Sequence, residues 1–368
     1  MVPLARRILW KEKLRFFITS FIIGVLILLV QLLFNIYEGA KECALSYVSN
    51  CRADIWVCPK NETNILRSSS VMDGSLENKL RGLQGIDSIS KIVKLISSSK
   101  IKGINETLII FGFDTTSSLA EPPFIFRGKK SIKSGEIIIE KIIAKKHKLN
   151  IGDSIEISSK KFCISGISEF TNAVTIQFAF ITINDAEKLL GVPGKVSFYL
   201  LRKSKNANTQ SLVDSIKINN NVEAFEKPVF IQNNLSEVGK GILPILWTIA
   251  ITGSIAGIII ITLMLQNSIM EKKEEYAIMK ALGANKRFLV FLVMRISISS
   301  ALIGYILGTG LNIILSYILP EFVFELVIYS SYFVLELTLL SSVIISLLAS
   351  WFSISKLFEI EPAEVFKP

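Results

Sequence analysis

The sequence predicts a helical membrane protein with four spanning helices and one inserted α/β (α+β) domain of two subdomains. Three observations lead there. Half of the 368 residues are hydrophobic, and the mean hydropathy is positive. The apolar residues gather into four runs that are almost free of charge, each long enough to cross a hydrocarbon core of about 30 Å. About 200 more polar residues separate the first run from the second.

The four runs and their flanks divide the chain into nine segments. The spans are residues 16–37, 241–270, 288–319 and 332–355. The remaining segments are an amphipathic elbow helix (1–15), the large domain (38–240), a helical loop (271–287), a short loop (320–331) and a tail (356–368). The first span has no small-x-small site after it and is too long for a cleavable signal peptide, so we expect it to remain.

Lysine and arginine in the short flanks predict the orientation. Residues 1–15, the 271–287 loop and the tail carry the cationic residues, whereas the 320–331 loop has none. Positively charged flanks stay inside the cell. We therefore expect a multi-pass protein of the bacterial plasma membrane with both termini cytoplasmic and residues 38–240 outside. The net charge of +10 then favours lipid contact over nucleic acid.

The inserted domain shows short strand and helix signals. We expect strands at 53–58, 108–113, 136–139, 154–157 and 162–167, the last two forming a hairpin through 158–161. Helices are expected at 140–149 and 185–190, the second capped by Asn184 and ended by Gly191.

Signals for a metal site or an enzyme are weak. The cysteines are Cys43, Cys51, Cys58 and Cys163, with no C-x-x-C pair, and it stays open whether any of them form disulfides. The one histidine, His147, lies among lysines and is expected to be a solvated helix residue. The chain has no P-loop, no H-E-x-x-H and no G-x-S-x-G motif. We expect no catalytic residue and no metal in this chain.

The 271–287 loop carries the clearest functional pattern. Glu274 and Glu275 lie in its first turn, where a helix favours anions. Tyr276, Met279 and Leu282 recur every three residues and predict one apolar face, and Gly283 is placed for a left-handed C-cap. This face either lies on the bilayer or neighbouring spans, or docks on a cytoplasmic partner. The full candidate set is Glu274, Glu275, Tyr276, Ile278, Met279, Lys280, Leu282 and Gly283.

Two further patterns concern the membrane. The elbow alternates apolar residues with cations and contains an aromatic, as an interfacial helix does; its candidate residues are Arg6, Arg7, Trp10, Lys13 and Arg15. The second and third spans contain G-x-x-x-G, at Gly253 and Gly257 and at Gly304 and Gly308, which predicts close helix packing, either within one subunit or at a dimer seam. The spans hold few ionisable groups, which argues against an ion-coupled transporter.

These motifs resemble the MacB/FtsX class of ABC transporter permeases. The resemblance rests on the span order, on the loop sequence E-E-Y-A-I-M-K-A-L-G-A from Glu274 and on the opening P-L-A-R-R-I-L-W. The run A-D-I-W-V and the ending E-P-A-E-V-F are most similar to the heterocyst glycolipid exporter permease (DevC-like) branch. Arg295 stands where many members have an acidic or amide residue.

The resemblance implies a non-catalytic permease that couples a separate cytoplasmic ATPase to movement of the outer domain. ATP and Mg would bind to that partner, not to this chain. A second permease copy would complete a dimer, and a periplasmic membrane-fusion adaptor is a further expected partner. Two alternatives remain: an FtsX-type regulator of cell-wall hydrolases, and a lipoprotein-extracting permease.

Overall fold

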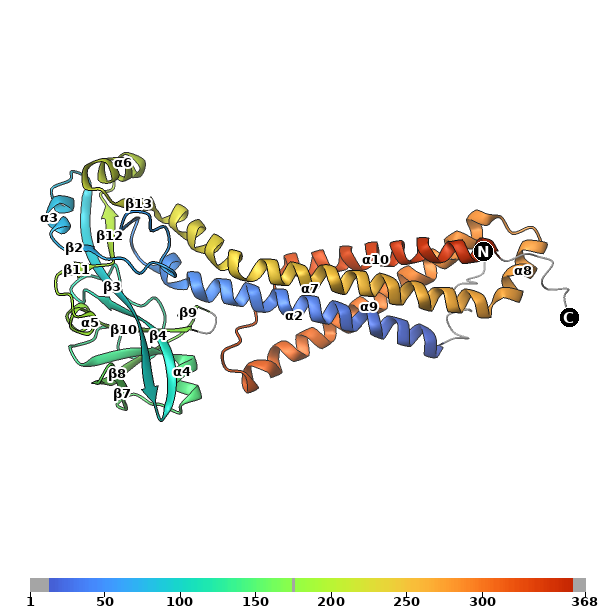
Figure 1. Ribbon diagram of the computed structural model, residues 1–368, viewed down its shortest axis with the longest axis horizontal. Helices are drawn as coiled ribbons and strands as arrows, with labels where there is room; N and C mark the ends of the chain where they lie inside the picture. Colours follow the sequence, from blue (N-terminus) through green and yellow to red (C-terminus); the bar gives the residue numbers. More distant parts are fainter. Residues whose placement is uncertain (1–12, 174–175, 360–368) are drawn as a thin grey trace. The chain divides into compact units, whose positions relative to one another are not determined.

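The computed structural model describes residues 13–173 and 176–359, which form two compact units (Figure 1). The helical unit comprises the described parts of residues 1–38, 243–322 and 328–368, and the α/β unit comprises residues 39–242 and 323–327. Among the described residues, four helices are long and apolar enough to cross a membrane: α2 (Lys13–Asn50), α7 (Lys227–Glu271), α9 (Lys286–Phe322) and α10 (Tyr332–Glu359). The predicted fold class is therefore confirmed.

Helices α2 and α7 run well past the uncharged segments. Helix α2 continues to Asn50, and α7 begins at Lys227, so each contributes residues to both units. The length of an uncharged run reflects the thickness of hydrocarbon that the helix crosses. The ends of the helix are set instead by where its backbone hydrogen bonds stop, so a helix can extend beyond the uncharged run.

Glycines bring α2 and α9 into close contact. A Cβ atom added at Gly304 would lie 2.7 Å from the Ser20 carbonyl oxygen, and one at Gly308 would lie 2.4 Å from the Gly24 carbonyl oxygen. The prediction of close packing at Gly304 and Gly308 is thus confirmed.

The glycines of α7 have different surroundings. A Cβ atom at Gly253 would meet nothing within 4 Å, and one at Gly257 would approach only the end of the Leu26 side chain. These two glycines therefore do not bring α7 into close backbone packing within the chain, and the alternative of a dimer seam stays a prediction. Gly24 in α2, the partner of Gly308, was missed because a lone glycine carries no spacing signal.

Buried polar side chains link the spanning helices. Gln31 of α2 is buried and donates hydrogen bonds from Nε2 to the hydroxyls of Thr309 (3.0 Å) and Thr338 (2.9 Å). The hydroxyls of Ser297 on α9 and Ser346 on α10 lie 2.6 Å apart. Such bonds matter in lipid because an unpaired polar group there has no water to bond.

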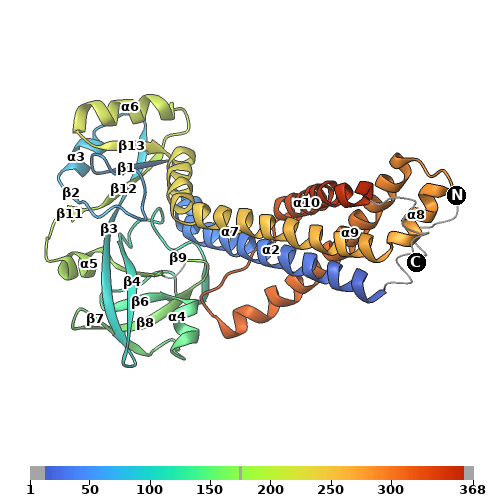
Figure 2. The ribbon, with the colours of Figure 1, turned by 45° about the vertical axis from the view of Figure 1, so that its right-hand side comes forward.

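The α/β unit contains one continuous sheet in the order β13-β1-β12-β3-β4-β10-β6-β8-β5 (Figure 2). Strands β4 and β10 pair in parallel, as do β6 and β8. Strand β7 pairs with β3 and β8, β9 pairs with β10, and β11 and β2 form a separate ladder. The strands are β1 (Ile55–Cys58), β2 (Met72–Asp73), β3 (Ile86–Ile101), β4 (Ile104–Phe113), β5 (Ile125–Gly128), β6 (Glu136–Glu140), β7 (Ser154–Ile157), β8 (Lys160–Ser168), β9 (Asn172–Ala173), β10 (Ile176–Thr182), β11 (Lys195–Val196), β12 (Phe198–Lys203) and β13 (Glu223–Glu226).

Alternation along the strands separates the cores on the two faces of this sheet. On one face, Trp56 and Phe111 join a single aromatic-rich core that also includes Tyr47 of α2 and Phe230 of α7. The opposite face carries two cores, as expected when successive side chains point to opposite sides. The 16-residue strand β3 contributes to all three cores, so the two predicted subdomains share one sheet.

Helices α3 (Leu76–Arg81), α4 (Lys141–Lys146), α5 (Ile183–Leu190) and α6 (Thr209–Asn220) accompany the sheet. Thr182 caps α5, because its hydroxyl accepts a hydrogen bond from the Asp185 N–H; the prediction of Asn184 as the cap was wrong. The helix ends as expected at Gly191, whose φ is +73°. The β7–β8 hairpin turns at Ser158 and Ser159, which both have positive φ.

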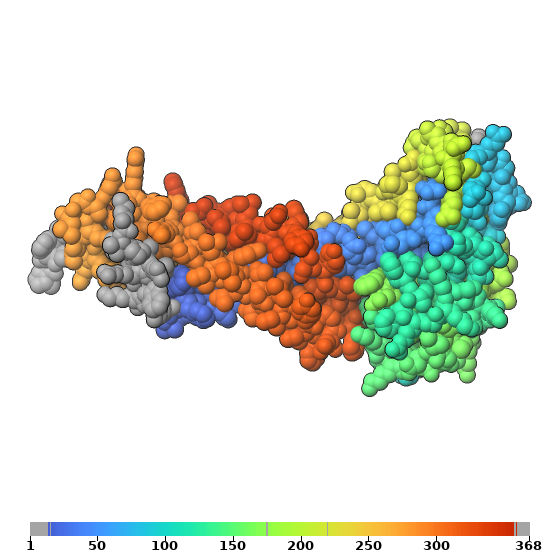
Figure 3. Space-filling model, turned by 180° about the vertical axis from the view of Figure 1, so that it is seen from behind, coloured from blue at the N-terminus to red at the C-terminus, as the bar shows by residue number. Residues whose placement is uncertain are grey.

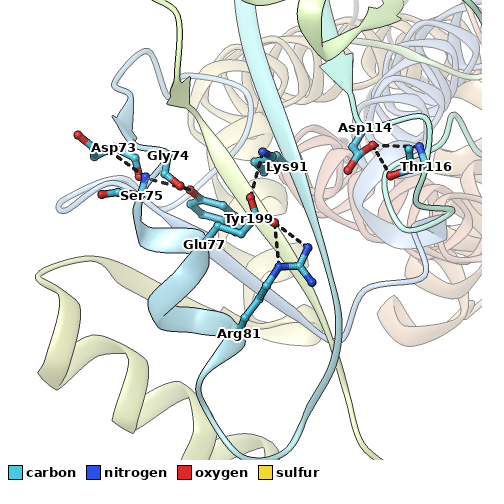
Figure 4. A network of polar contacts seen from close by, with 9 residues as sticks. All are labelled: Asp73, Gly74, Ser75, Glu77, Arg81, Lys91, Asp114, Thr116 and Tyr199. Carbon is cyan, nitrogen blue, oxygen red and sulfur yellow. Dashed lines mark hydrogen bonds and ion pairs between the residues drawn. The ribbon is translucent and has the colours of Figure 1, made fainter.

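A polar network fixes α3 beside the sheet (Figure 4). The Tyr199 hydroxyl donates to the Gly74 carbonyl oxygen at 3.0 Å. Glu77 pairs with Lys91 of β3 at 3.0 Å and with Arg81 at 2.6 Å. Partial burial opposes ionisation, but these two cations hold the pKa of Glu77 below its ordinary value.

We predict that Gly308→Leu destabilises the helical unit. The added side chain collides with α2 backbone, and overpacking of this kind costs about 1–3 kcal/mol. Thermal unfolding of the purified full-length protein in detergent measures the effect. Gly253→Leu is the matched control and should leave the midpoint unchanged, since that site is open. Equal loss in both variants would show that the α2–α9 contact is unimportant.

Candidate functional site

The candidate site is α8 (Lys273–Ala281), the short helix between the second and third spanning helices (Figures 1 and 3). It follows α7 after a break at Lys272, whose backbone is no longer helical. Glu274 and Glu275 occupy its first turn and Lys280 its last turn, which matches the helix dipole at both ends. In Figure 3 the orange segment that contains α8 lies at the surface of the helical unit.

One side of α8 is buried within its own unit. Tyr276 is 3% exposed and Ala277 is fully buried, and both pack in a core formed by Ile269 of α7 and by α9. The α9 residues of this core are Leu289, Leu292 and Val293, and Met279 packs partly against it. Of the two alternatives for this face, Tyr276 and Met279 therefore follow the one in which it packs on neighbouring spans, and the hypothesis that they dock on a partner was wrong.

The other side of α8 is open. Ile278 is 47% exposed and Leu282 is 83% exposed. A helix turns by about 100° per residue, so the three-residue spacing of Tyr276, Met279 and Leu282 drifts by about 120° around the axis. The four-residue spacing from Ile278 to Leu282 keeps these two apolar side chains close together, and the exposed Glu274 lies one turn earlier. We call Glu274, Ile278 and Leu282 the open face.

A left-handed glycine ends α8. Gly283 has a φ of +89°, as predicted. The Ala284 N–H donates to the Met279 carbonyl oxygen at 2.9 Å, and the Gly283 N–H donates to the Lys280 carbonyl oxygen at 3.0 Å. These two bonds form a Schellman motif, which fixes the turn into α9.

The other residues proposed from the sequence have varied positions. Arg6, Arg7 and Trp10 lie outside the described residues, and Lys13 and Arg15 belong to the first turns of α2. Arg295 is exposed on α9. Partial burial and the nearby Lys286 lower the pKa of Lys280 below its ordinary value.

The part of the chain that the structure describes holds no cluster of three His, Cys, Asp or Glu residues suited to a metal. All four cysteines are free, and only Cys163 is exposed. His147 is buried, with Nε2 2.8 Å from Glu106 Oε1, so the prediction of a solvated histidine was wrong. The lysine-rich flanks of His147 hid the inward-facing position of its side chain on α4.

Glu140 is a buried carboxyl group in the α/β unit. It is 1% exposed and caps α4 by accepting a hydrogen bond from the Ile142 N–H. Burial raises the pKa of Glu140 to about 7 against the effect of that bond. The nearby Glu169 carboxylate acts in the same direction as burial, and Lys141 opposes it.

We predict that this carboxyl makes stability depend on pH. The folded protein binds the Glu140 proton more tightly than the unfolded chain, so this stabilisation is complete below about pH 4.5 and is lost as the pH rises through about 7. The change is at most about 3 kcal/mol. Thermal unfolding across this range should show the slope in wild type and a reduced slope in Glu140→Gln, which keeps the acceptor oxygen. An equal slope in both proteins would contradict the assignment.

A second prediction separates the two sides of α8. Tyr276→Ala should destabilise the helical unit by about 3–5 kcal/mol, because it empties a buried aromatic position. Leu282→Ala should change stability by less than about 0.5 kcal/mol, because Leu282 is exposed. Chemical unfolding of the two variants in detergent measures both values. Similar losses in the two variants would show that Leu282 is also part of the core.

Comparisons with known proteins find similarity to permeases. Residues 247–362 match the family model described as FtsX-like permease C-terminal, a segment that includes α8, α9 and all of α10. The putative hemin transport system permease protein HrtB of Staphylococcus haemolyticus is 23% identical over 96% of this chain and 97% of its own length. The uncharacterized ABC transporter permease MJ1507 of Methanocaldococcus jannaschii is 26% identical over 46% of this chain. The chain spans 44% of that archaeal relative.

Solved structures similar to this chain match about half of it. The periplasmic region of MacB from Actinobacillus actinomycetemcomitans has a TM-score of 0.41 and 11% identity, covering 51% of this chain and 96% of that one. The extracellular domain of the transporter YknZ from Gram-positive bacteria has a TM-score of 0.37 and 11% identity, covering 47% and 99%. The family match is the specific finding: residues 247–362 match the FtsX-like permease C-terminal model, and the whole chain is similar to an ABC-type permease.

Proposed function

We propose that this chain is the permease subunit of an ABC-type efflux or mechanotransmission complex, in which a separate ATPase drives movement of the α/β unit. The observation that carries the proposal is the open face of α8. An exposed pair of large apolar side chains on a short, firmly anchored helix is suited to insertion into a groove on a partner protein.

The anchoring supports transmission of force. Tyr276 and Ala277 fasten α8 to α7 and α9, so a load applied at Leu282 reaches both spanning helices through packed side chains. Helix α7 is continuous from Lys227 to Glu271 and therefore joins the α8 end of the helical unit to the α/β unit without a loop.

The partners follow from this assignment. ATP and Mg would bind to the ATPase, and α8 and both termini would lie on the cytoplasmic side of a bacterial plasma membrane. A second permease copy and a periplasmic membrane-fusion adaptor would complete the complex. The motifs at Ala53 and Glu361 support a relationship to the DevC-like branch.

The test is to place charge on the open face. We expect the double variant Ile278→Asp, Leu282→Asp to lose the ATPase, because burying an unpaired carboxylate in an interface costs several kcal/mol. The tagged full-length chain is captured in detergent, its ATPase subunit is identified by mass spectrometry, and vanadate-sensitive ATP hydrolysis in the captured complex is measured.

The matched control is the double variant Ile218→Asp, Val229→Asp on the α/β unit. Ile218 is 82% exposed and Val229 is 47% exposed, against 83% for Leu282 and 47% for Ile278, so the control adds the same two charges at the same exposure. The control should retain the ATPase, and all variants should insert into the membrane at wild-type levels. Normal capture and hydrolysis in the double variant would refute docking through α8.

A further inference from the structure

The α/β unit has a basic pocket beside α4 that none of the roles above uses. The pocket has a volume of about 420 Å³ and lies between α4, β5 and β8. The residues that line it include four cations and no carboxylate: Arg127, Lys141, Lys145 and Lys148. Its apolar lining comes from Phe126, Ala144, Leu149 and Ile167.

Most of the positive charge in this pocket is not neutralised by the protein. Lys141 pairs with Glu169. Within the described part of the chain, Arg127, Lys145 and Lys148 form no ion pair, and all three are exposed. Three uncompensated cations around an apolar floor suit a ligand that has an anionic group and an apolar body.

One exposed aromatic side chain lines this pocket, and two more are exposed close to it in the sequence, on either side of β5 and β8. Phe126 is exposed, and its ring lies 4.1 Å from Lys141 Nζ and 5.6 Å from the Arg127 guanidinium carbon. Phe124 and Phe170 are also exposed, and their rings meet edge to face at 6.3 Å. Exposed phenylalanines interleaved with lysines are typical of surfaces that rest on the headgroup region of a bilayer.

Helix α4 also contacts a segment that starts and ends in the membrane. Lys146, next to Lys145, pairs with Glu325 at 2.7 Å. Glu325 belongs to the short connection between α9, which ends at Phe322, and α10, which begins at Tyr332. Both helices are long enough to span the bilayer, so their connection lies at a membrane surface. Lys146, which forms an ion pair with this connection, lies there too. This contact favours a membrane lipid over a soluble acidic peptide as the occupant.

We propose that the pocket formed by Phe126, Arg127, Lys145 and Lys148 binds the phosphate headgroup of an anionic membrane lipid. The phosphate meets the three unpaired cations, the glycerol region covers Ala144 and Leu149, and Phe124 and Phe170 enter the headgroup layer. This site does not depend on the proposed ATPase docking.

The test is a titration of the purified full-length protein, in an uncharged detergent, with dihexanoyl phosphatidylglycerol. Lys145→Glu, Lys148→Glu should raise Kd by at least about tenfold, because each basic residue near an anionic lipid contributes several-fold to binding. Arg127→Ala, a single and milder change, should raise Kd about threefold to fivefold on the same basis.

The matched control is Lys160→Glu, Lys161→Glu, an exposed lysine pair on the β7–β8 hairpin that makes the same change in net charge outside the pocket. This control should bind like wild type. Dihexanoyl phosphatidylcholine, with the same chains and no net charge, should bind wild type at least about tenfold more weakly. Equal binding of the two lipids, equal loss in the control, or hexaglutamate binding in place of the lipid would each overturn the proposal.

Discussion

The close approach of α2 and α9 is the contact on which the helical unit depends. In a bilayer, apolar side chains gain little from leaving lipid for protein, so burial of apolar surface does not select helix partners. Backbone contact at Gly24, Gly304 and Gly308 does select them, because at these glycines two spanning helices meet without side chains between them. Hydrogen bonds from Gln31 to Thr309 and Thr338 then link α2 to both α9 and α10. The core beneath α8 forms on the same helix α9.

The α/β unit is held together differently, because there the burial of apolar side chains from water determines which elements pack together. Aromatic residues of the sheet form one core together with Tyr47 and Phe230, which lie near the ends of α2 and α7. Rings such as Trp56 and Phe230, stacked at 4.8 Å, join these helix ends to the sheet. The same two helices thus supply apolar spans in the helical unit and aromatic side chains in the core of the α/β unit.

Much of this architecture was predictable from the sequence. Uncharged runs predicted four spans, and short runs of strand-forming residues predicted strands such as β1 and β7. Single-residue details were harder. Whether Asn184 or Thr182 caps α5 depends on which residue is the last with extended backbone before the helix begins. Composition does not show where that is. Strand β3 pairs with its neighbour β4 and also with β12, which is distant in the sequence, so it joins the two predicted subdomains. No local pattern reveals such a long-range pairing.

The candidate site shows the same division. The helix, its acidic first turn and its glycine cap followed from local chemistry, and Gly283 adopts the expected conformation. Which side of α8 faces the protein depended on packing against Leu289 and Val293 of a later helix. That information is tertiary, and it divides the predicted face into a buried Tyr276 and an open Leu282.

This division has a consequence for evolution. Tyr276 maintains the fold, whereas Leu282 lies beyond the last helical residue of α8, at the Schellman turn, and contributes little to the core. A substitution at Leu282 therefore alters the surface offered to other proteins with almost no loss of folding stability. Duplicated copies of such a gene can acquire different partners through changes at this one exposed position, while the buried side of the helix keeps every copy folded.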